Sequence, residues 1–107
     1  MDKAISVVLL CYTGASSSYF VESLKEEAIT RKVNLRIDSY TISPFPADFS
    51  KYDVILMAPQ VKHCLKQVEK RVDKAKIPII NIGFTDFGLH ETGKILDQIL
   101  ALLTQKK

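Results

Sequence analysis

The chain has 107 residues, of which 47% are hydrophobic and 25% are charged. This size and balance predict one globular domain spanning residues 1–107. The net charge of +3 comes from 15 basic and 12 acidic residues spread along the chain, so no nucleic-acid partner is expected. The two cysteines lie far apart and fit neither a CxxC redox pair nor a metal cluster, which predicts free thiols and a cytoplasmic location. No segment is long and apolar enough to cross a membrane.

The first half of the chain alternates strand and helix patterns. Residues 4–10 form a continuous apolar run, typical of a strand covered by helices on both faces. Residues 17–32 predict a helix that buries one face, formed by Phe20, Val21, Leu24 and Ala28. Residues 35–40 alternate apolar and polar side chains, as expected of a strand at the edge of a sheet.

The second half continues the alternation. Residues 54–57 predict a short buried strand, and a helix follows Pro59 with an apolar stripe at Val61, Cys64, Leu65, Val68 and Val72. Residues 77–82 predict a fourth strand, whose early Pro78 suits a sheet edge. A last helix is expected over residues 90–104, with Ile95, Leu96, Ile99, Leu102 and Leu103 on its buried side. Alternating strands and helices predict a parallel sheet, in which ligands bind beyond the carboxyl ends of the strands.

Cys11 follows the first strand and opens a segment of small and hydroxyl side chains that leads into the first helix. Backbone N–H groups and the positive end of the helix dipole would converge on this segment and favour an anion there. We call residues 12–18 the anion cradle. Its candidate phosphate-binding residues are Tyr12, Thr13, Gly14, Ala15, Ser16, Ser17 and Ser18. Such surroundings favour a thiolate and would hold a phosphoryl group bound to the sulfur. A buried core cysteine is the alternative, but the small polar residues that follow contribute little to packing.

Other candidate residues have simpler explanations. Loops 58–60 and 83–88 reach the same sheet edge as Cys11, where Pro59 and Gln60 are candidate site residues and Phe84 or Phe87 could support a docking partner. Cys64 lies on an apolar stripe, and His63 and His90 are expected to be passive surface residues. The six basic residues between positions 62 and 76 are interrupted by acids and predict a solvated helix face. Neither a metal site nor a cofactor is expected.

The cysteine, glycine and serine pattern at 11–18, together with the Pro-Gln pair after the third strand, resembles the enzyme IIB components of the lactose/cellobiose class. These belong to the bacterial phosphoenolpyruvate-dependent sugar phosphotransferase system. The resemblance covers nearly the whole chain. It implies a single three-layer α/β domain, with a four-stranded parallel sheet in the flavodoxin-like order 2-1-3-4 and a P-loop-like segment after the first strand.

The resemblance also implies a phosphoryl relay with Cys11 as the carrier. A phosphohistidine of a IIA protein would donate to Cys11, and phosphocysteine would donate to a sugar held by the membrane IIC component, a β-linked disaccharide such as cellobiose, chitobiose or lactose. The sequence does not identify the sugar. Loop amides can stabilise the transferring phosphoryl group without arginine or a metal ion.

Two alternatives share parts of this pattern. Low-molecular-weight phosphatases and related arsenate reductases place a cysteine after the first strand, but they need an arginine six residues later, where this chain has Ser17, and an Asp-Pro pair that is also missing. A flavodoxin-like module would hold the phosphate of FMN at the same topological position. This chain is shorter than that fold usually is and has no tryptophan to stack on the flavin ring.

Overall fold

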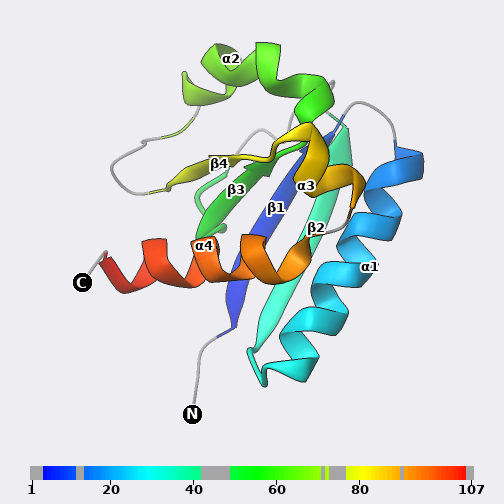
Figure 1. The fold of residues 1–107 in the computed structure, drawn as a ribbon. Coiled ribbons are helices and arrows are strands. Elements are labelled where there is room, and N and C mark those ends of the chain that lie inside the picture. The colour runs from blue at the N-terminus through cyan, green and yellow to red at the C-terminus, as the bar shows by residue number, and fades with distance from the viewer. Residues whose placement is uncertain are drawn as a thin grey trace.

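The computed structural model describes residues 4–11, 14–41, 49–70, 72, 77–89 and 91–105. Its elements are β1 (Ile5–Cys11), α1 (Gly14–Thr30), β2 (Leu35–Thr41), β3 (Val54–Met57), the 3-10 helix η1 (Pro59–Cys64), α2 (Leu65–Glu69), β4 (Ile79–Asn81), α3 (Phe84–Gly88) and α4 (Thr92–Gln105). The strands form a parallel four-stranded sheet in the order β2-β1-β3-β4 (Figure 1). The predicted fold class and strand order are therefore confirmed.

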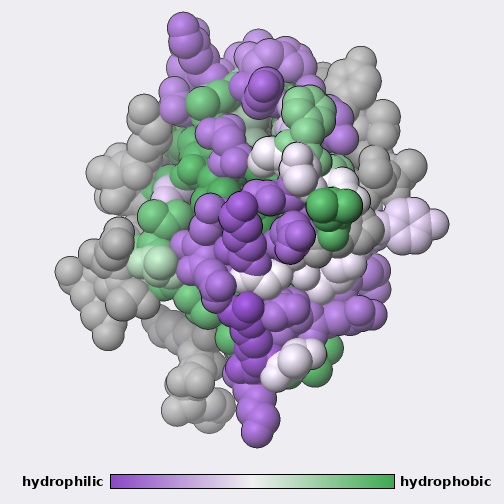
Figure 2. All heavy atoms as spheres, in the orientation of Figure 1, coloured by the Kyte–Doolittle hydropathy of each residue, from purple (hydrophilic) through white to green (hydrophobic). Residues whose placement is uncertain are grey.

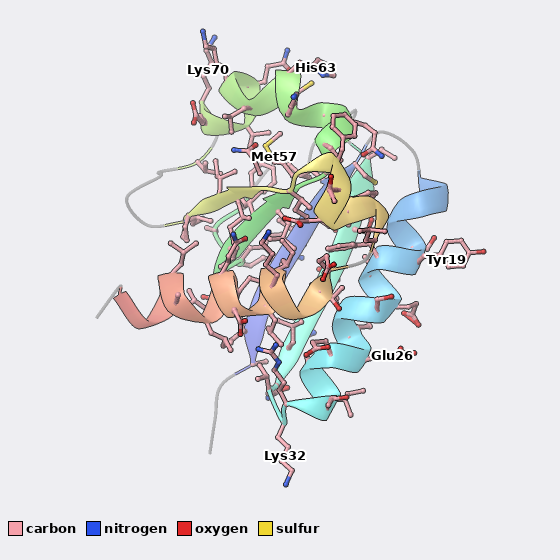
Figure 3. All side chains as sticks on the ribbon, in the orientation of Figure 1. Tyr19, Glu26, Lys32, Met57, His63 and Lys70 are labelled. Carbon is pink, nitrogen blue, oxygen red and sulfur yellow. The ribbon has the colours of Figure 1, made fainter. Side chains whose placement is uncertain are left out.

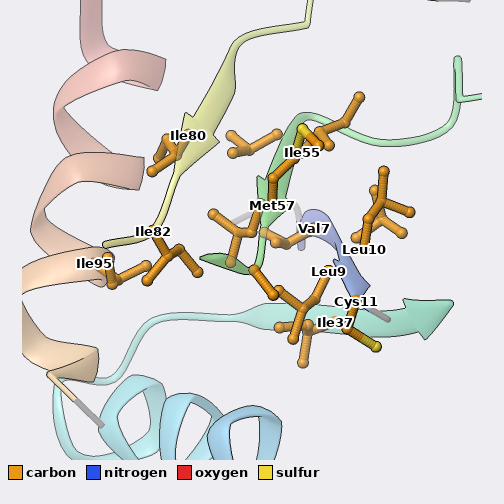
Figure 4. Close-up of a cluster of buried hydrophobic side chains, with 14 of the residues drawn as sticks. Val7, Leu9, Leu10, Cys11, Ile37, Ile55, Met57, Ile80, Ile82 and Ile95 are labelled. Carbon is orange, nitrogen blue, oxygen red and sulfur yellow. The ribbon is translucent and has the colours of Figure 1, made fainter. Parts of the chain in front are cut away.

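Helices cover the sheet on both faces. Helices α1 and α4 lie side by side along one face, whereas η1 and α2 lie over the other (Figure 1). The central strand β1 is apolar on both sides because it is covered twice, and Val7, Val8, Leu9 and Leu10 have no exposed surface. The buried side chains on the α1 and α4 side include Leu9, Ile37, Ile80 and Ile95 (Figure 4).

Strand β2 lies at the sheet edge, as its alternating pattern predicts. Ile37 is buried and pairs in register with Val7 of β1, while Arg36 and Asp38 are exposed on the opposite face. The alternation arises because successive side chains of a strand point to opposite faces, and here α1 covers only one of them.

Helix α1 begins and ends earlier than the predicted range 17–32. It starts at Gly14 and ends at Thr30, so the predicted limits were wrong by two or three residues. At its end, Lys32 adopts the left-handed conformation with φ 60°. Its N–H donates to the carbonyl of Ile29 at 3.0 Å, and the N–H of Val33 donates to that of Ala28 at 2.8 Å. These are the paired bonds of a Schellman ending, formed here without glycine.

The second half departs from the prediction in four places. The helix after Pro59 is η1 followed by the short α2, and Val72 lies beyond its end, although it still packs against the core. Strand β4 spans only Ile79–Asn81 and is shorter than the predicted residues 77–82. Pro78 before it has no N–H to donate, but its carbonyl accepts from Ile55 N at 3.0 Å. The predicted loop 83–88 contains the helix α3, and α4 starts at Thr92 rather than at position 90.

An arginine joins the two helices on the same face. Arg31, just after the end of α1, is bonded to Glu27 of α1 and to Asp97 of α4, and it also donates to the Gly93 carbonyl at 3.3 Å. Hydrophilic side chains cover most of this side of the molecule, with smaller apolar areas between them (Figure 2). In the part of the chain that the structure describes, no helix is long and apolar enough to span a membrane.

Candidate functional site

The carboxyl ends of three strands are aligned by backbone hydrogen bonds. Ala58 N donates to the carbonyl of Leu10 at 2.9 Å, which ties the end of β3 to the end of β1. Ile82 N donates to the carbonyl of Met57 at 2.9 Å, which ties β4 to β3. Cys11 and the segments 58–60 and 82–84 therefore lie together where the strands end, and we call this end of the sheet the carboxyl rim.

Cys11 is the last residue of β1, one position further into the strand than the sequence predicted. Its side chain is 2% exposed. The sulfur points toward β2 (Figure 4) and lies 3.9 Å from the Ser39 hydroxyl and 3.6 Å from the Tyr40 carbonyl oxygen. The thiol therefore lies at the carboxyl rim beside polar groups of the neighbouring strand β2.

Most of the predicted anion cradle is the first turn of a helix and not a loop. Gly14, the segment 15–17 and Ser18 belong to α1, while Tyr12 and Thr13 lie outside the described residues. The first N–H groups of a helix lack partners within it, and they carry its positive dipole end. The first turn of α1 has no acidic residue to offset that end. A long helix thus begins three positions after the thiol, which suits an anion bound there.

The predicted rim residues differ in exposure. Pro59 is buried at the start of η1, and Gln60 beside it is exposed. Phe84 is 63% exposed, with the Lys62 ammonium 5.5 Å from its ring centroid. Phe87, which was the other candidate docking residue, is not available at the rim surface. It is buried against Phe20, with ring centroids 5.0 Å apart.

The cysteine, histidine and lysine residues that were expected to lie outside the site do so where the structure describes them. Cys64 is 9% exposed and packs in the core between Val61 and Val68, as predicted. His63 points away from the body of the protein (Figure 3), and His90 lies outside the described residues. Lys62, Lys66 and Lys70 are all exposed, as expected for a solvated helix face.

A cavity of about 260 Å³ lies at the opposite end of the sheet from Cys11. Its lining residues are Ser6, Arg36, Asp38, Lys51 and Tyr52. The Tyr52 hydroxyl donates to Asp38 at 2.8 Å, and burial together with this bond raises the pKa of Tyr52. The lining comes from the first half of β1 and β2 and the turn before β3, so the cavity is not part of the thiol site.

Sequence reasoning missed the groups that touch the thiol. Ser39 and Tyr40 come from β2, which the sequence treats only as an edge strand. Their approach depends on the pairing register, in which Leu9 is opposite Ser39 and Cys11 is opposite Thr41. The sequence does show a hydroxyl side chain, Ser39, near the carboxyl end of β2. It could be connected with Cys11 only by knowing that β2 lies next to β1 in the sheet.

The structure is thus an α/β domain with a 2-1-3-4 parallel sheet, in which a cysteine at the end of the central strand precedes the first turn of a long helix. Residues 6–98 match the family model of the lactose/cellobiose-specific IIB subunit of the phosphotransferase system. The chain belongs to this family. Its members are phosphotransferase components that transfer a phosphoryl group to sugar, and the match favours this activity over the phosphatase, arsenate reductase and FMN-binding alternatives.

Individual relatives agree with the family match. The chain is 25% identical over 100 residues to the oligo-beta-mannoside-specific EIIB component of Bacillus subtilis (strain 168), covering 94% of this chain and 97% of that protein. The fold is similar to the lactose-specific IIB domain of Streptococcus pneumoniae, with a TM-score of 0.79, 22% identity and coverage of 92% and 97%. It is equally similar to the cellobiose-specific IIB protein of Borrelia burgdorferi, with a TM-score of 0.79, 24% identity and coverage of 100% and 98%.

Proposed function

We propose that the whole chain is a single cytoplasmic IIB domain that carries the phosphoryl group on the Sγ atom of Cys11. The donor is a phosphohistidine of a IIA protein, and the acceptor is a sugar bound by a membrane IIC component. The observation that carries this proposal is the position of Cys11 at the carboxyl rim, three residues before the first turn of α1. No other described cysteine or histidine lies between a strand end and the start of a long helix: Cys64 is in the core and His63 is on an outer face.

The chemistry requires two in-line transfers at phosphorus. In the first, the Cys11 sulfur forms a bond to phosphorus while the phosphorus–nitrogen bond of the donor breaks, and the proton lost from the thiol balances the one gained by the leaving imidazole. In the second, a sugar hydroxyl forms a bond to phosphorus while the sulfur–phosphorus bond breaks, and the proton lost from the hydroxyl balances the one regained by the Cys11 thiol. The first N–H groups of α1, which have no carbonyl partner within the helix, would stabilise the equatorial oxygens in both steps.

The partners would approach the carboxyl rim. Phe84 offers an exposed ring beside Lys62 there, which suits a small and transient contact with a IIA protein. The named relatives are specific for oligo-beta-mannoside, lactose and cellobiose, which supports a β-linked disaccharide or short oligosaccharide as the sugar. The sugar pocket belongs to the IIC component, so this chain sets the chemistry and not the choice of sugar.

The test is to trace labelled phosphate from a phosphohistidine IIA donor to the purified protein. Wild type is expected to take up one label per chain at Cys11, and Cys11→Ser is expected to lose it because a serine hydroxyl stays protonated near neutral pH. Peptide mapping locates the label. Circular dichroism checks that the variant is folded.

Matched variants separate this proposal from its alternatives. Cys64→Ser and His63→Ala are expected to accept the label as wild type does, and so is His90→Ala. Loss of labelling in Cys64→Ser, or a label mapped to His63 or His90, would contradict the assignment of Cys11 as the phosphoryl carrier.

A further inference from the structure

Among the described residues, two groups of different hydrogen-bonding character lie near the sulfur of Cys11. The Tyr40 carbonyl oxygen, 3.6 Å away, can only accept a hydrogen bond. The Ser39 hydroxyl, 3.9 Å away, can either accept or donate. Both distances are within the longer range that sulfur allows. The two neighbours therefore respond differently when the thiol loses its proton.

Resting on the proposed role of Cys11 as phosphoryl carrier, we propose that Ser39 is a positioning residue that stabilises the Cys11 thiolate before phosphoryl transfer. In the neutral thiol, S–H donates to the Tyr40 carbonyl. In the thiolate this carbonyl faces an anion and opposes it, whereas the Ser39 hydroxyl can turn and donate to the sulfur. Ser39 thus offsets the unfavourable carbonyl at the moment when the nucleophile is formed.

The position of Ser39 has no other structural explanation among its described contacts. Its side chain is exposed on an edge strand, so the hydroxyl is not needed to satisfy a buried group. The register places Ser39 opposite Leu9 and on the same sheet face as Cys11, two positions before Thr41, the residue opposite Cys11. An alanine there would leave no buried cavity, and removal of the hydroxyl therefore changes the sulfur's surroundings with little effect on packing.

The effect belongs to the first transfer. The Cys11 thiol gives up its proton, the sulfur–phosphorus bond forms and the phosphorus–nitrogen bond of the donor breaks, while the leaving imidazole of the IIA protein gains a proton. A donor hydrogen bond to the thiolate raises the fraction of reactive nucleophile at neutral pH and holds the sulfur in a fixed orientation. Both consequences accelerate acceptance of the phosphoryl group.

The test compares wild type, Ser39→Ala and Ser39→Thr, with Ser50→Ala as a control for loss of an exposed serine hydroxyl before β3. The thiolate is followed by its ultraviolet absorbance and by the rate of iodoacetamide alkylation of Cys11 across a range of pH, in a Cys64→Ser background. Ser39→Ala is expected to move the pH midpoint of both profiles upward and to lower the alkylation rate near neutral pH roughly three- to tenfold. Ser39→Thr, which keeps the hydroxyl, and Ser50→Ala are expected to follow wild type.

The second measurement is the rate of label transfer from the phosphohistidine IIA donor, which should fall by the same factor in Ser39→Ala. Profiles of Ser39→Ala that coincide with wild type, or a shift that Ser39→Thr shares, would overturn the role of Ser39. Alkylation profiles need no phosphoryl donor, so this outcome is distinct from failure of the proposed function, in which wild-type Cys11 would accept no label whatever the state of residue 39.

Discussion

The two cysteines of this protein occupy two different regions, and burial does not tell them apart. Cys11 is 2% exposed and Cys64 is 9% exposed, so the proposed nucleophile is the more buried of the two. What differs is the surroundings. Cys11 ends β1 beside Ser39 and Tyr40 and precedes the start of a long helix, whereas Cys64 ends the 3-10 helix η1 and packs among apolar side chains.

The same contrast recurs in the two phenylalanines of α3. Phe84 is 63% exposed at the carboxyl rim, and Phe87, three residues later, is buried against Phe20 of α1. One end of this short helix is exposed at the carboxyl rim, and the other packs against the core. In both pairs, the residue at the carboxyl rim is the one proposed to take part in phosphoryl transfer or docking, and the other packs in the core.

The largest expected effect tests the packing side of the phenylalanine pair. Phe87→Ala removes a buried ring that stacks on Phe20, and it is expected to lower the free energy of unfolding by about 3–5 kcal/mol. Phe84→Ala removes an exposed ring and should change it by less than about 0.5 kcal/mol. Urea unfolding of both variants measures the difference. Equal destabilisation would show that the exposed end of α3 also contributes to packing.

Phe84→Ala sharpens the same comparison when phosphoryl transfer is measured. The variant is expected to accept the label more slowly from the IIA donor at limiting concentration, and to recover at high donor concentration, because only docking is weakened. A transfer rate equal to that of wild type at every donor concentration would remove Phe84 from the proposed docking surface.

The next effect separates the two thiols by reactivity. Near neutral pH, Cys11 is expected to react with iodoacetamide roughly 30-fold faster than Cys64, because a helix start and a donor hydroxyl favour its thiolate. Cys64 precedes only the five-residue helix α2 and packs among apolar side chains. Peptide mapping over time gives both rates in one sample. Faster labelling of Cys64 would reverse the distinction between the regions.

A smaller effect concerns stability at the same two positions. Cys64→Ser places a hydroxyl among apolar side chains and is expected to lower the free energy of unfolding by about 1–2 kcal/mol. Cys11→Ser should cost less, since the new hydroxyl lies beside polar groups of β2, the Ser39 hydroxyl and the Tyr40 carbonyl, rather than among apolar side chains. Cys64→Ala serves as the control that removes the sulfur without adding a polar group. A larger loss in Cys11→Ser than in Cys64→Ser would contradict this account.

The fold was predictable because its strongest patterns are local. The apolar run of β1, the buried face of α1 and the alternation of β2 each follow from side-chain periodicity, and the order of strands and helices then predicts a parallel sheet. Two elements were missed for physical reasons. The five residues of α3 are too few to show a helical period, and their stability comes from the contact of Phe87 with Phe20. The division of η1 from α2 is likewise not visible in the sequence pattern, because buried apolar residues continue through both elements.

The candidate site was only partly predictable, for a related reason. Cys11 and the helix that follows it are neighbours in the sequence, so their association can be inferred directly. Ser39 and Tyr40 reach the sulfur from 28 and 29 residues away, through the register of β1 against β2. The exposure of Phe84 and the burial of Phe87 also depend on which way α3 turns, which no local pattern determines.

The smallest expected effect is weak binding of a free anion. Inorganic phosphate or sulfate should shift amide NMR signals of residues 13–18, since the first-turn N–H groups of α1 lack helical partners, and affinity should be in the millimolar range, about 4 kcal/mol or less. A thiolate at Cys11 would repel the anion, so Cys11→Ser should bind it more tightly than wild type, most clearly at alkaline pH. The exposed residues Lys62, Lys66 and Lys70, in the region of Cys64, serve as the internal control for non-specific attraction of the anion by positive charge. Shifts spread over these lysines, and equal in both proteins, would mean that net charge and not the helix start attracts the anion; shifts confined to residues 13–18 and enhanced in Cys11→Ser would place anion binding in the region of Cys11 alone.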